Sequence, residues 1–173
     1  MRKYLFILLA LTFVSCSDEN EFGPAQEIEN VSESEVPEEV KNALKRQRTF
    51  NFPEGNHNII TNADELEDVC QGEITLPNMG FFTKYDIVVG VVRTNDTGYS
   101  IKEVKLKDIG KSYQLDVYLN KHDYAFCAFS WFLYWEVFPK LENKPMTVRL
   151  FLANGEPFTI PQEKYDGDSE IYR

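Results

Sequence analysis

The stretch Lys84-Tyr-Asp-Ile-Val-Val-Gly-Val-Val-Arg93 decides how this chain folds. It is an almost unbroken β-branched run of the length of one strand, which predicts a strand that is covered on both faces. The turn residues Thr94-Asn-Asp-Thr-Gly98 follow it, and two more strands are expected at 99–107 and 112–120. The sequence therefore predicts a three-stranded antiparallel meander against which the remaining elements pack.

The second and third strands differ in how regularly polar and apolar residues alternate. In the second strand the alternation changes phase between Ile101 and Val104, and a β-bulge near Lys102-Glu103 would reconcile the two halves. In the third strand the apolar residues at every second position should face the core, namely Tyr113, Leu115, Val117 and Leu119.

The flanking segments complete an α+β fold. Downstream, residues 129–140 form an aromatic strand with two apolar faces, and Asn154-Gly155 predicts a C-terminal hairpin that pairs 146–152 with Phe158 and Ile160. Upstream, Asn62 and Glu65 have capping-box spacing at the start of a helix over 62–71, and a second helix is possible at 38–47. We expect an antiparallel sheet of five or more strands with one or two short helices.

The N-terminus carries an export signal. A basic start precedes an apolar run of eleven residues, 4–14, which is too short to span a bilayer and predicts a signal peptide over residues 1–15. Phe13-Val-Ser-Cys16 resembles the bacterial lipobox. That resemblance implies that Cys16 becomes the first mature residue and carries acyl chains such as palmitate, which hold the protein on a lipid bilayer. The alternative is an ordinary signal peptide with a coincidental cysteine.

The residues after Cys16 predict a tether and a single domain. Residues 16–36 are acidic and lack apolar periodicity, so we expect a disordered spacer there, followed by one domain over 37–173 with its core at about 57–161. Ser17-Asp-Glu-Asn20 resembles the surface-export signal of Bacteroidetes lipoproteins. It implies an outer-membrane lipoprotein exposed on the cell surface, and a periplasm-facing lipoprotein is the alternative.

The charge distribution argues against nucleic acid as a partner. Residues 17–42 contain nine acidic residues and one lysine, and residues 43–173 contain 19 acidic and 15 basic residues. Neither part offers the basic face that nucleic acid requires.

Two cysteines remain if Cys16 is acylated. In an oxidising compartment Cys70 and Cys127 could form one disulfide, and two buried free thiols are the alternative.

No constellation of side chains predicts catalysis or a metal ion. His122-Asp123 lies near Cys127, but an exposed polar turn accounts for it, and the histidines and cysteines lack metal-ligand spacing. Asp166-Gly-Asp-Ser-Glu170 lacks the remaining ligands of a calcium loop. The acidic residues between 64 and 68 suit the start of a helix. We therefore expect no enzyme activity, no cofactor and no metal.

Aromatic residues supply the binding-patch candidates: Phe82, Trp131, Tyr134 and Trp135. Exposed on a sheet, such rings could anchor a protein partner or stack on sugar rings, whereas buried rings would belong to the core. A glycan-binding module is therefore one alternative function, and a hydrolase of unknown type is another.

Residues 57–150 also carry a family resemblance. The segments Ile59-Ile-Thr-Asn-Ala-Asp-Glu-Leu66, Phe82-Thr-Lys-Tyr-Asp-Ile-Val-Val89 and Trp135-Glu-Val-Phe-Pro-Lys140 resemble small Bacteroidetes lipoproteins related to the C-terminal domain of PrcB-type protease-complex stabilising proteins. The resemblance implies a non-catalytic accessory domain that supports a protein partner. The expected function is thus a membrane-anchored binding lipoprotein without catalytic activity.

Overall fold

Strand β3 (Tyr85–Thr94), formed by the β-branched run, lies in the middle of an antiparallel sheet between β2 (His57–Ile60) and β6 (Ser130–Pro139). We call this the central sheet. The structure is a computed structural model that describes residues 24–52, 56–71, 80–123, 126 and 130–159.

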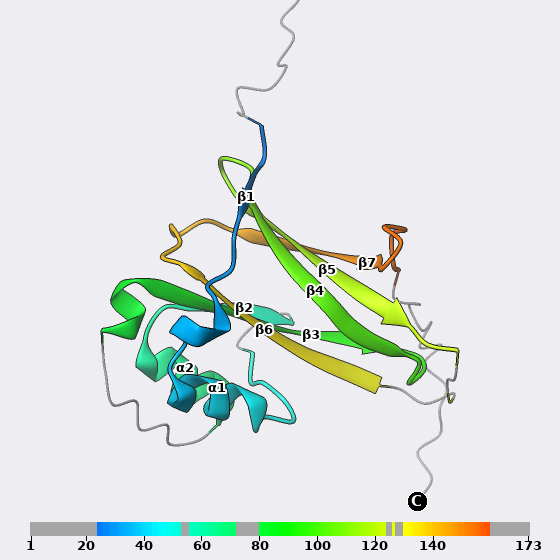
Figure 1. The fold of residues 1–173 in the computed structure, drawn as a ribbon, viewed down its shortest axis with the longest axis horizontal. Coiled ribbons are helices and arrows are strands. Elements are labelled where there is room, and N and C mark those ends of the chain that lie inside the picture. Colours follow the sequence, from blue (N-terminus) through cyan, green and yellow to red (C-terminus); the bar gives the residue numbers. More distant parts are fainter. Residues whose placement is uncertain (1–23, 53–55, 72–79, 124–125, 127–129, 160–173) are drawn as a thin grey trace, which may run out of the picture.

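A second, outer sheet packs on one face of the central sheet (Figure 1). Its order is β1-β4-β5-β7, with β5 and β7 parallel and the other pairs antiparallel. Its strands are β1 (Gln26–Ile28), β4 (Tyr99–Asp108), β5 (Tyr113–Lys121) and β7 (Met146–Leu152). The helical elements are η1 (Glu33–Glu35), α1 (Glu38–Lys45), α2 (Ala63–Cys70) and η2 (Phe81–Thr83).

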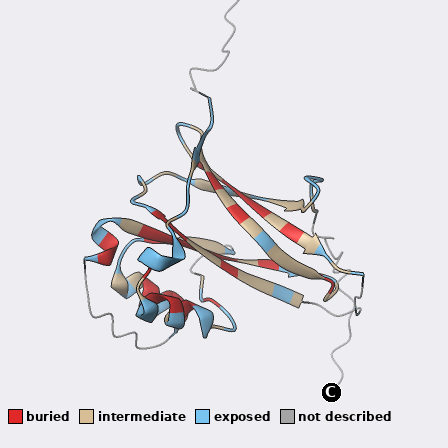
Figure 2. Cartoon of the chain, in the orientation of Figure 1, coloured by how far each residue is buried: buried red, intermediate tan, exposed pale blue. Residues whose placement is uncertain are grey.

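Strand β3 contributes to two separate hydrophobic cores because its side chains alternate between two covered faces. Ile87 and Val89 belong to a helix-side core with residues of α1 and α2, such as Val40, Leu66 and Val69. On the opposite face an inter-sheet core joins the two sheets; it consists of Val88, Val92, Val104, Leu106, Tyr113, Leu115, Val117, Leu119, Tyr134 and Phe138. Figure 2 shows this burial along the strands and helices.

The α+β class is confirmed, but the predicted meander is wrong at its first step. β3 pairs with β2 and β6, whereas β4 pairs with β5 in the other sheet. The reason lies in the residue patterns. β3 is apolar on both faces and fits a middle layer, whereas β4 and β5 each carry a polar face that must remain at the surface.

Several finer predictions for these strands are confirmed. The register of β4 against β5 shifts between Ile101 and Glu103, which is the expected bulge. All four apolar residues of β5 face the inter-sheet core. The turn at Asn154-Gly155 also forms, with Gly155 at a φ of 88°. Its returning segment reaches β7 through one bridge, Phe151 to Pro157, and Ile160 lies outside the described residues.

Both predicted helices form. Asn62 caps α2, because its side-chain oxygen accepts a hydrogen bond from the Glu65 amide at 2.9 Å. The Glu65 carboxylate reaches back one residue beyond the cap, to the Thr61 amide at 2.6 Å. The structure has no helix long and apolar enough to cross a membrane among the residues that it describes.

The predicted disordered tether over 16–36 is wrong for residues 24–36, which are part of the fold. β1 pairs with the last residues of β4, the Val31 amide donates to the Val137 carbonyl of β6 at 2.7 Å, and Val36 is buried. We call residues 24–36 the strap, because they contact β4 of the outer sheet and β6 of the central sheet. Apolar residues at 28, 31 and 36, although not periodic, provide its attachment. Cys16 and residues 17–23 lie outside the described residues.

Cys70, one of the two cysteines of the predicted disulfide, is a free thiol buried in the helix-side core. This burial raises the pKa of the thiol to about 11. Cys127 lies outside the described residues, so the pairing stays a prediction.

Candidate functional site

A polar cleft of about 620 Å³ lies between β2, the start of β3 and the crossover at residues 140–146 that joins the two sheets. It is lined by His57, Asn58, Ile59, Thr61, Glu65, Asp86, Lys140, Leu141, Glu142, Asn143, Lys144 and Met146. Sequence reasoning did not identify this cleft, because its residues are brought together only by the crossover.

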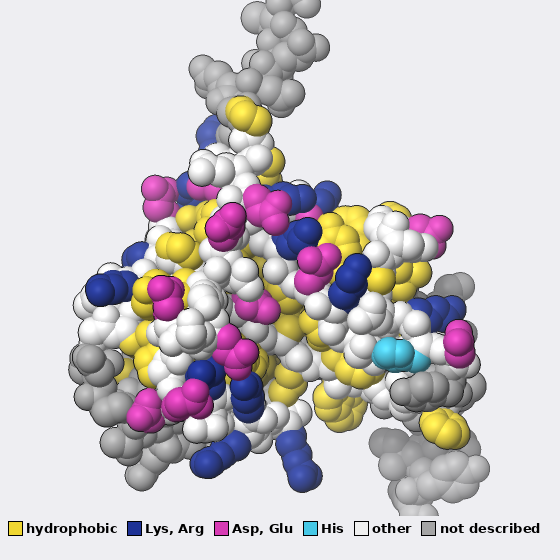
Figure 3. All heavy atoms as spheres, in the orientation of Figure 1, with side chains coloured by type: hydrophobic (Ala, Val, Ile, Leu, Met, Phe, Trp, Pro, Cys, Tyr) yellow, Lys and Arg dark blue, Asp and Glu magenta, His cyan; other side chains and the backbone are white. Residues whose placement is uncertain are grey.

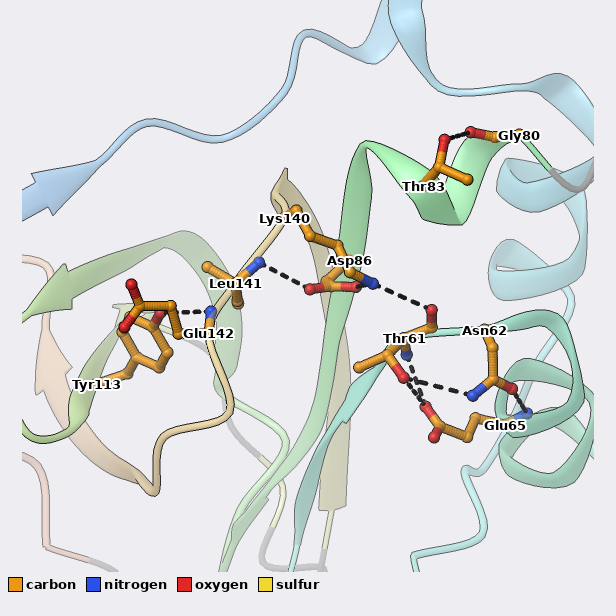
Figure 4. A network of polar contacts seen from close by, with 10 residues as sticks. All are labelled: Thr61, Asn62, Glu65, Gly80, Thr83, Asp86, Tyr113, Lys140, Leu141 and Glu142. Carbon is orange, nitrogen blue, oxygen red and sulfur yellow. Dashed lines mark hydrogen bonds and ion pairs between the residues drawn. The ribbon is translucent and has the colours of Figure 1, made fainter.

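Asp86 is at the centre of the polar network in this cleft (Figure 4). Its carboxylate is fully buried and accepts hydrogen bonds from the Lys140 ammonium at 2.6 Å and from the Leu141 amide at 2.8 Å. Lys140 also donates to the Thr61 carbonyl at 3.2 Å. One carboxylate thus fixes the start of the crossover to β3, and Lys140 extends this link to the end of β2.

The remainder of the crossover is fixed to the outer sheet. The Glu142 amide donates to the Tyr113 hydroxyl at 2.9 Å, and the Tyr113 amide donates to the Pro145 carbonyl at 2.8 Å. Lys144 forms ion pairs with Asp108 at 2.7 Å and Glu142 at 3.0 Å. The hydrogen bond that Lys144 donates to Asp108, followed by the one that it donates to Glu142, raises the pKa of Lys144.

The two lysines of the cleft are therefore paired with carboxylates, and the Glu65 carboxylate is bonded to Thr61. His57 is half-buried, and desolvation lowers its pKa although its ring is hydrogen-bonded to the Met146 backbone. No buried side-chain nitrogen or oxygen in the described part of the chain lacks a partner. Likewise, the described residues contain no cluster of three or more His, Cys, Asp or Glu side chains that could hold a metal. This geometry suits a structural tie between the sheets.

The histidine considered for catalysis has a partner that the sequence did not suggest. His122 Nε2 lies 2.9 Å from the Ser100 hydroxyl, across the start of β4 and the end of β5. Asp123 is exposed, and Cys127 lies outside the described residues. His122 is thus hydrogen-bonded to a serine. Whether His122 lies near Cys127 stays untested, because Cys127 is outside the described residues.

The four binding-patch candidates have different environments, so they do not form one patch. Phe82 and Tyr134 are core residues, with 7% and 4% of their surface exposed, and Trp135 packs against the helix-side core. Trp131 is 60% exposed. Phe126, which sequence reasoning missed, is 74% exposed. Of the candidates, Trp131 alone presents a largely open ring.

These two exposed rings lie at the end of the fold opposite to the strap. Phe126 exchanges hydrogen bonds with Thr97, just before β4, and Trp131 lies opposite Arg93 at the end of β3. The strap enters at Gln26, which is paired with Asp108 at the other end of β4. At 3.3 Å per residue, β4 separates the two ends by about 30 Å.

The exposed face of the outer sheet carries a different aromatic pair. Tyr118 and Phe151 stack at 5.3 Å between ring centres, with Lys105 and Arg149 over the rings. Beside them Asp116 accepts hydrogen bonds from Arg149 at 2.8 and 3.0 Å and from Lys107 at 3.0 Å. Figure 3 shows acidic and basic side chains interspersed on the face in view.

Comparison of the chain with family models, curated proteins and solved structures finds no significant match.

Proposed function

We propose that this chain is a membrane-anchored binding lipoprotein without catalytic activity, which supports a protein partner at the cell surface. The main supporting observation is the position of the exposed rings. Trp131 and Phe126 lie at the end of the fold opposite to the strap, and the two ends of β4 are about 30 Å apart. An anchor on Cys16 would therefore leave the aromatic end free to meet a partner.

Two further observations support the proposal. The carboxylates of Asp86 and Glu142 are bonded to the ammonium groups of Lys140 and Lys144, which favours a structural role over chemistry on a substrate. The resemblance of residues 57–150 to PrcB-related lipoproteins favours a protein partner, and the Phe13-Val-Ser-Cys16 lipobox favours the lipid anchor.

The anchor and the partner can be tested in one bacterial strain that expresses the full chain. Metabolic labelling with palmitate should mark the wild type and not Cys16→Ala, and protease added to intact cells should digest a surface-exposed chain. Cross-linking in cells should give one stoichiometric protein adduct. Unlabelled Cys16 would contradict the anchor. Substrate turnover that is lost in Ser100→Ala, without any adduct, would contradict the binding role and favour a hydrolase.

A glycan-binding module is the second candidate, and the open indole of Trp131 favours it. Binding of neutral oligosaccharides that is abolished by Trp131→Ala and retained by Phe151→Ala would support this alternative.

A further inference from the structure

The central sheet is covered by helices over only part of its outer face. Ile87 and Val89 of β3 and Val137 of β6 belong to the helix-side core. Because side chains alternate along a strand, Val91 and Arg93 continue this face of β3, and Trp131 and Leu133 continue it on β6. Figure 1 shows both strands extending past α1 and α2. We call Val91, Arg93, Trp131 and Leu133 the distal strip.

The register makes the distal strip two adjacent cross-strand pairs. Arg93 lies opposite Trp131, and Val91 lies opposite Leu133. The Lys140 amide donates to the Lys84 carbonyl, so these two residues form a hydrogen-bonded pair in the register of β3 and β6. Every second pair along the two strands is hydrogen-bonded, and the two pairs of the strip are of the other, non-hydrogen-bonded kind. Side chains of such non-hydrogen-bonded pairs lie closest together. Arg93 and Trp131 are therefore close cross-strand neighbours on this face of the sheet.

This surface has an open ring and an available cation. Trp131 and Arg93 are exposed, whereas Val91 and Leu133 are half-buried beside them, and Leu133 packs against the edge of the helix-side core. Arg93 has no ion pair with any residue that the structure describes. In contrast, Lys140 and Arg149 at other places on the sheets are bonded to the buried carboxylates of Asp86 and Asp116.

We infer that the distal strip is the docking site for the protein partner, which inserts an apolar side chain against Trp131 and places a carboxylate on Arg93. This inference rests on the proposed binding function. Charge complementarity to the unpaired guanidinium selects an acidic group, and Trp and Arg are the residues that most often dominate protein interfaces. A glycan fits less well, because Val91 and Leu133 supply no side-chain hydrogen bonds for hydroxyl groups.

The test uses the mature lipoprotein in detergent and a phage-displayed library of random peptides as the probe. Enriched peptides should carry Asp or Glu next to an aromatic or aliphatic residue. Trp131→Ala should weaken their binding about thirty-fold, as expected for a hot-spot residue. Arg93→Glu should abolish it and should instead select peptides with Lys or Arg.

Matched controls separate the strip from general effects of charge and ring removal. Arg48→Glu makes the same charge change at an exposed site just after α1, and Phe151→Ala removes a half-buried ring from the outer sheet, away from the strip. Both should leave binding within about twofold, as is usual for residues outside a hot spot. The strip variants and Arg48→Glu change exposed side chains, so their thermal unfolding should match the wild type.

Three outcomes would overturn the inference: no enriched peptide, enriched peptides that bind Trp131→Ala normally, or oligosaccharide binding that depends on Trp131. The cross-linking experiment in cells reports independently on the proposed function. A stoichiometric adduct that persists in Trp131→Ala and Arg93→Glu would therefore reject the strip and leave the binding role standing.

Discussion

Asp86 joins the crossover between the sheets to the end of β3. It is fully buried and accepts hydrogen bonds from Lys140 and from the Leu141 amide. Replacing it by alanine removes both acceptors. We expect Asp86→Ala to lower the free energy of unfolding by about 2–4 kcal/mol. Urea denaturation of the wild type and the variant measures this difference.

Two comparisons sharpen the prediction for Asp86. Asp86→Asn keeps one acceptor and should fall between the wild type and alanine. Glu67→Ala removes an exposed carboxylate from α2 and should change stability by less than about 0.5 kcal/mol. A loss for Asp86→Ala as small as that of Glu67→Ala would show that the crossover does not depend on Asp86.

Gly90 is required because the ring of Tyr134 occupies the place of a side chain. The two residues lie opposite each other on β3 and β6, and a Cβ on Gly90 would lie 2.1 Å from the Tyr134 hydroxyl oxygen. We expect Gly90→Ala to destabilise the fold by about 3 kcal/mol through overpacking. Its cost should nearly vanish in a Tyr134→Ala background, which a double-mutant cycle by chemical denaturation would detect. Additive losses would contradict this account.

Asp116 should make the free energy of unfolding increase as the pH rises from about 3 to 5. Desolvation alone would raise its pKa, but the hydrogen bonds from Arg149 and Lys107 outweigh desolvation and lower the pKa. The unfolded chain therefore binds the proton more readily, so stability rises with pH in this range. The contribution, about 1–2 kcal/mol, is complete above the unfolded pKa near 4 and is lost as pH falls through the folded pKa.

Unfolding measured between pH 7 and pH 3 tests this dependence. Asp116→Asn should be less stable than the wild type at pH 7 and should approach it at low pH. A constant gap between the two proteins across this range would contradict the assigned role of the carboxylate.

At the scale of elements, local patterns predicted β5, the β4 bulge and the α2 cap correctly because each depends on neighbours in sequence. The pairing of β3 was wrong for the same reason. Thr94-Asn-Asp-Thr-Gly98 is a turn, as its composition indicates, but a turn does not determine whether the strands that it joins share a sheet. That choice depends on which strand must be covered on both faces.

The strap is an element whose removal can be measured. A chain starting at Pro37 loses β1, the Val31 bond and the buried Val36 side chain. We expect a loss of about 2–3 kcal/mol from these contacts, together with self-association through the uncovered edges of β4 and β6. Denaturation and size-exclusion chromatography measure both effects. Deleting only residues 17–23 is the control, and equal behaviour of the two truncations would contradict the role of the strap.

At the scale of the whole molecule, both hydrophobic cores share β3, so we expect a single cooperative unfolding transition. Tryptophan fluorescence, which includes Trp135 at the helix-side core, and far-UV circular dichroism should report the same midpoint in urea. Separate midpoints would show that the helical layer melts independently of the sheets.

The candidate surface could be predicted from sequence only in part. Trp131 and Trp135 lie on the same face of β6, so the alternation of residues along the strand does not distinguish them. They differ in exposure because the helix layer covers only part of the sheet, and the extent of that layer is a property of the assembled fold. Phe126 was missed because residues 121–128 carry no regular pattern, and the cleft was missed because its walls are distant in sequence.

The strap also has a mechanical consequence. If Cys16 carries the lipid that we propose, any drag on the domain enters the fold at β1, which resists with three residue pairs, whereas β3 and β6 share ten. The strap should therefore detach first and release its thirteen residues, which span at most about 45 Å when fully extended, while the other strands of both sheets stay paired. Under force, the tether of such a protein would lengthen before the domain unfolds, so the binding surface would keep its structure.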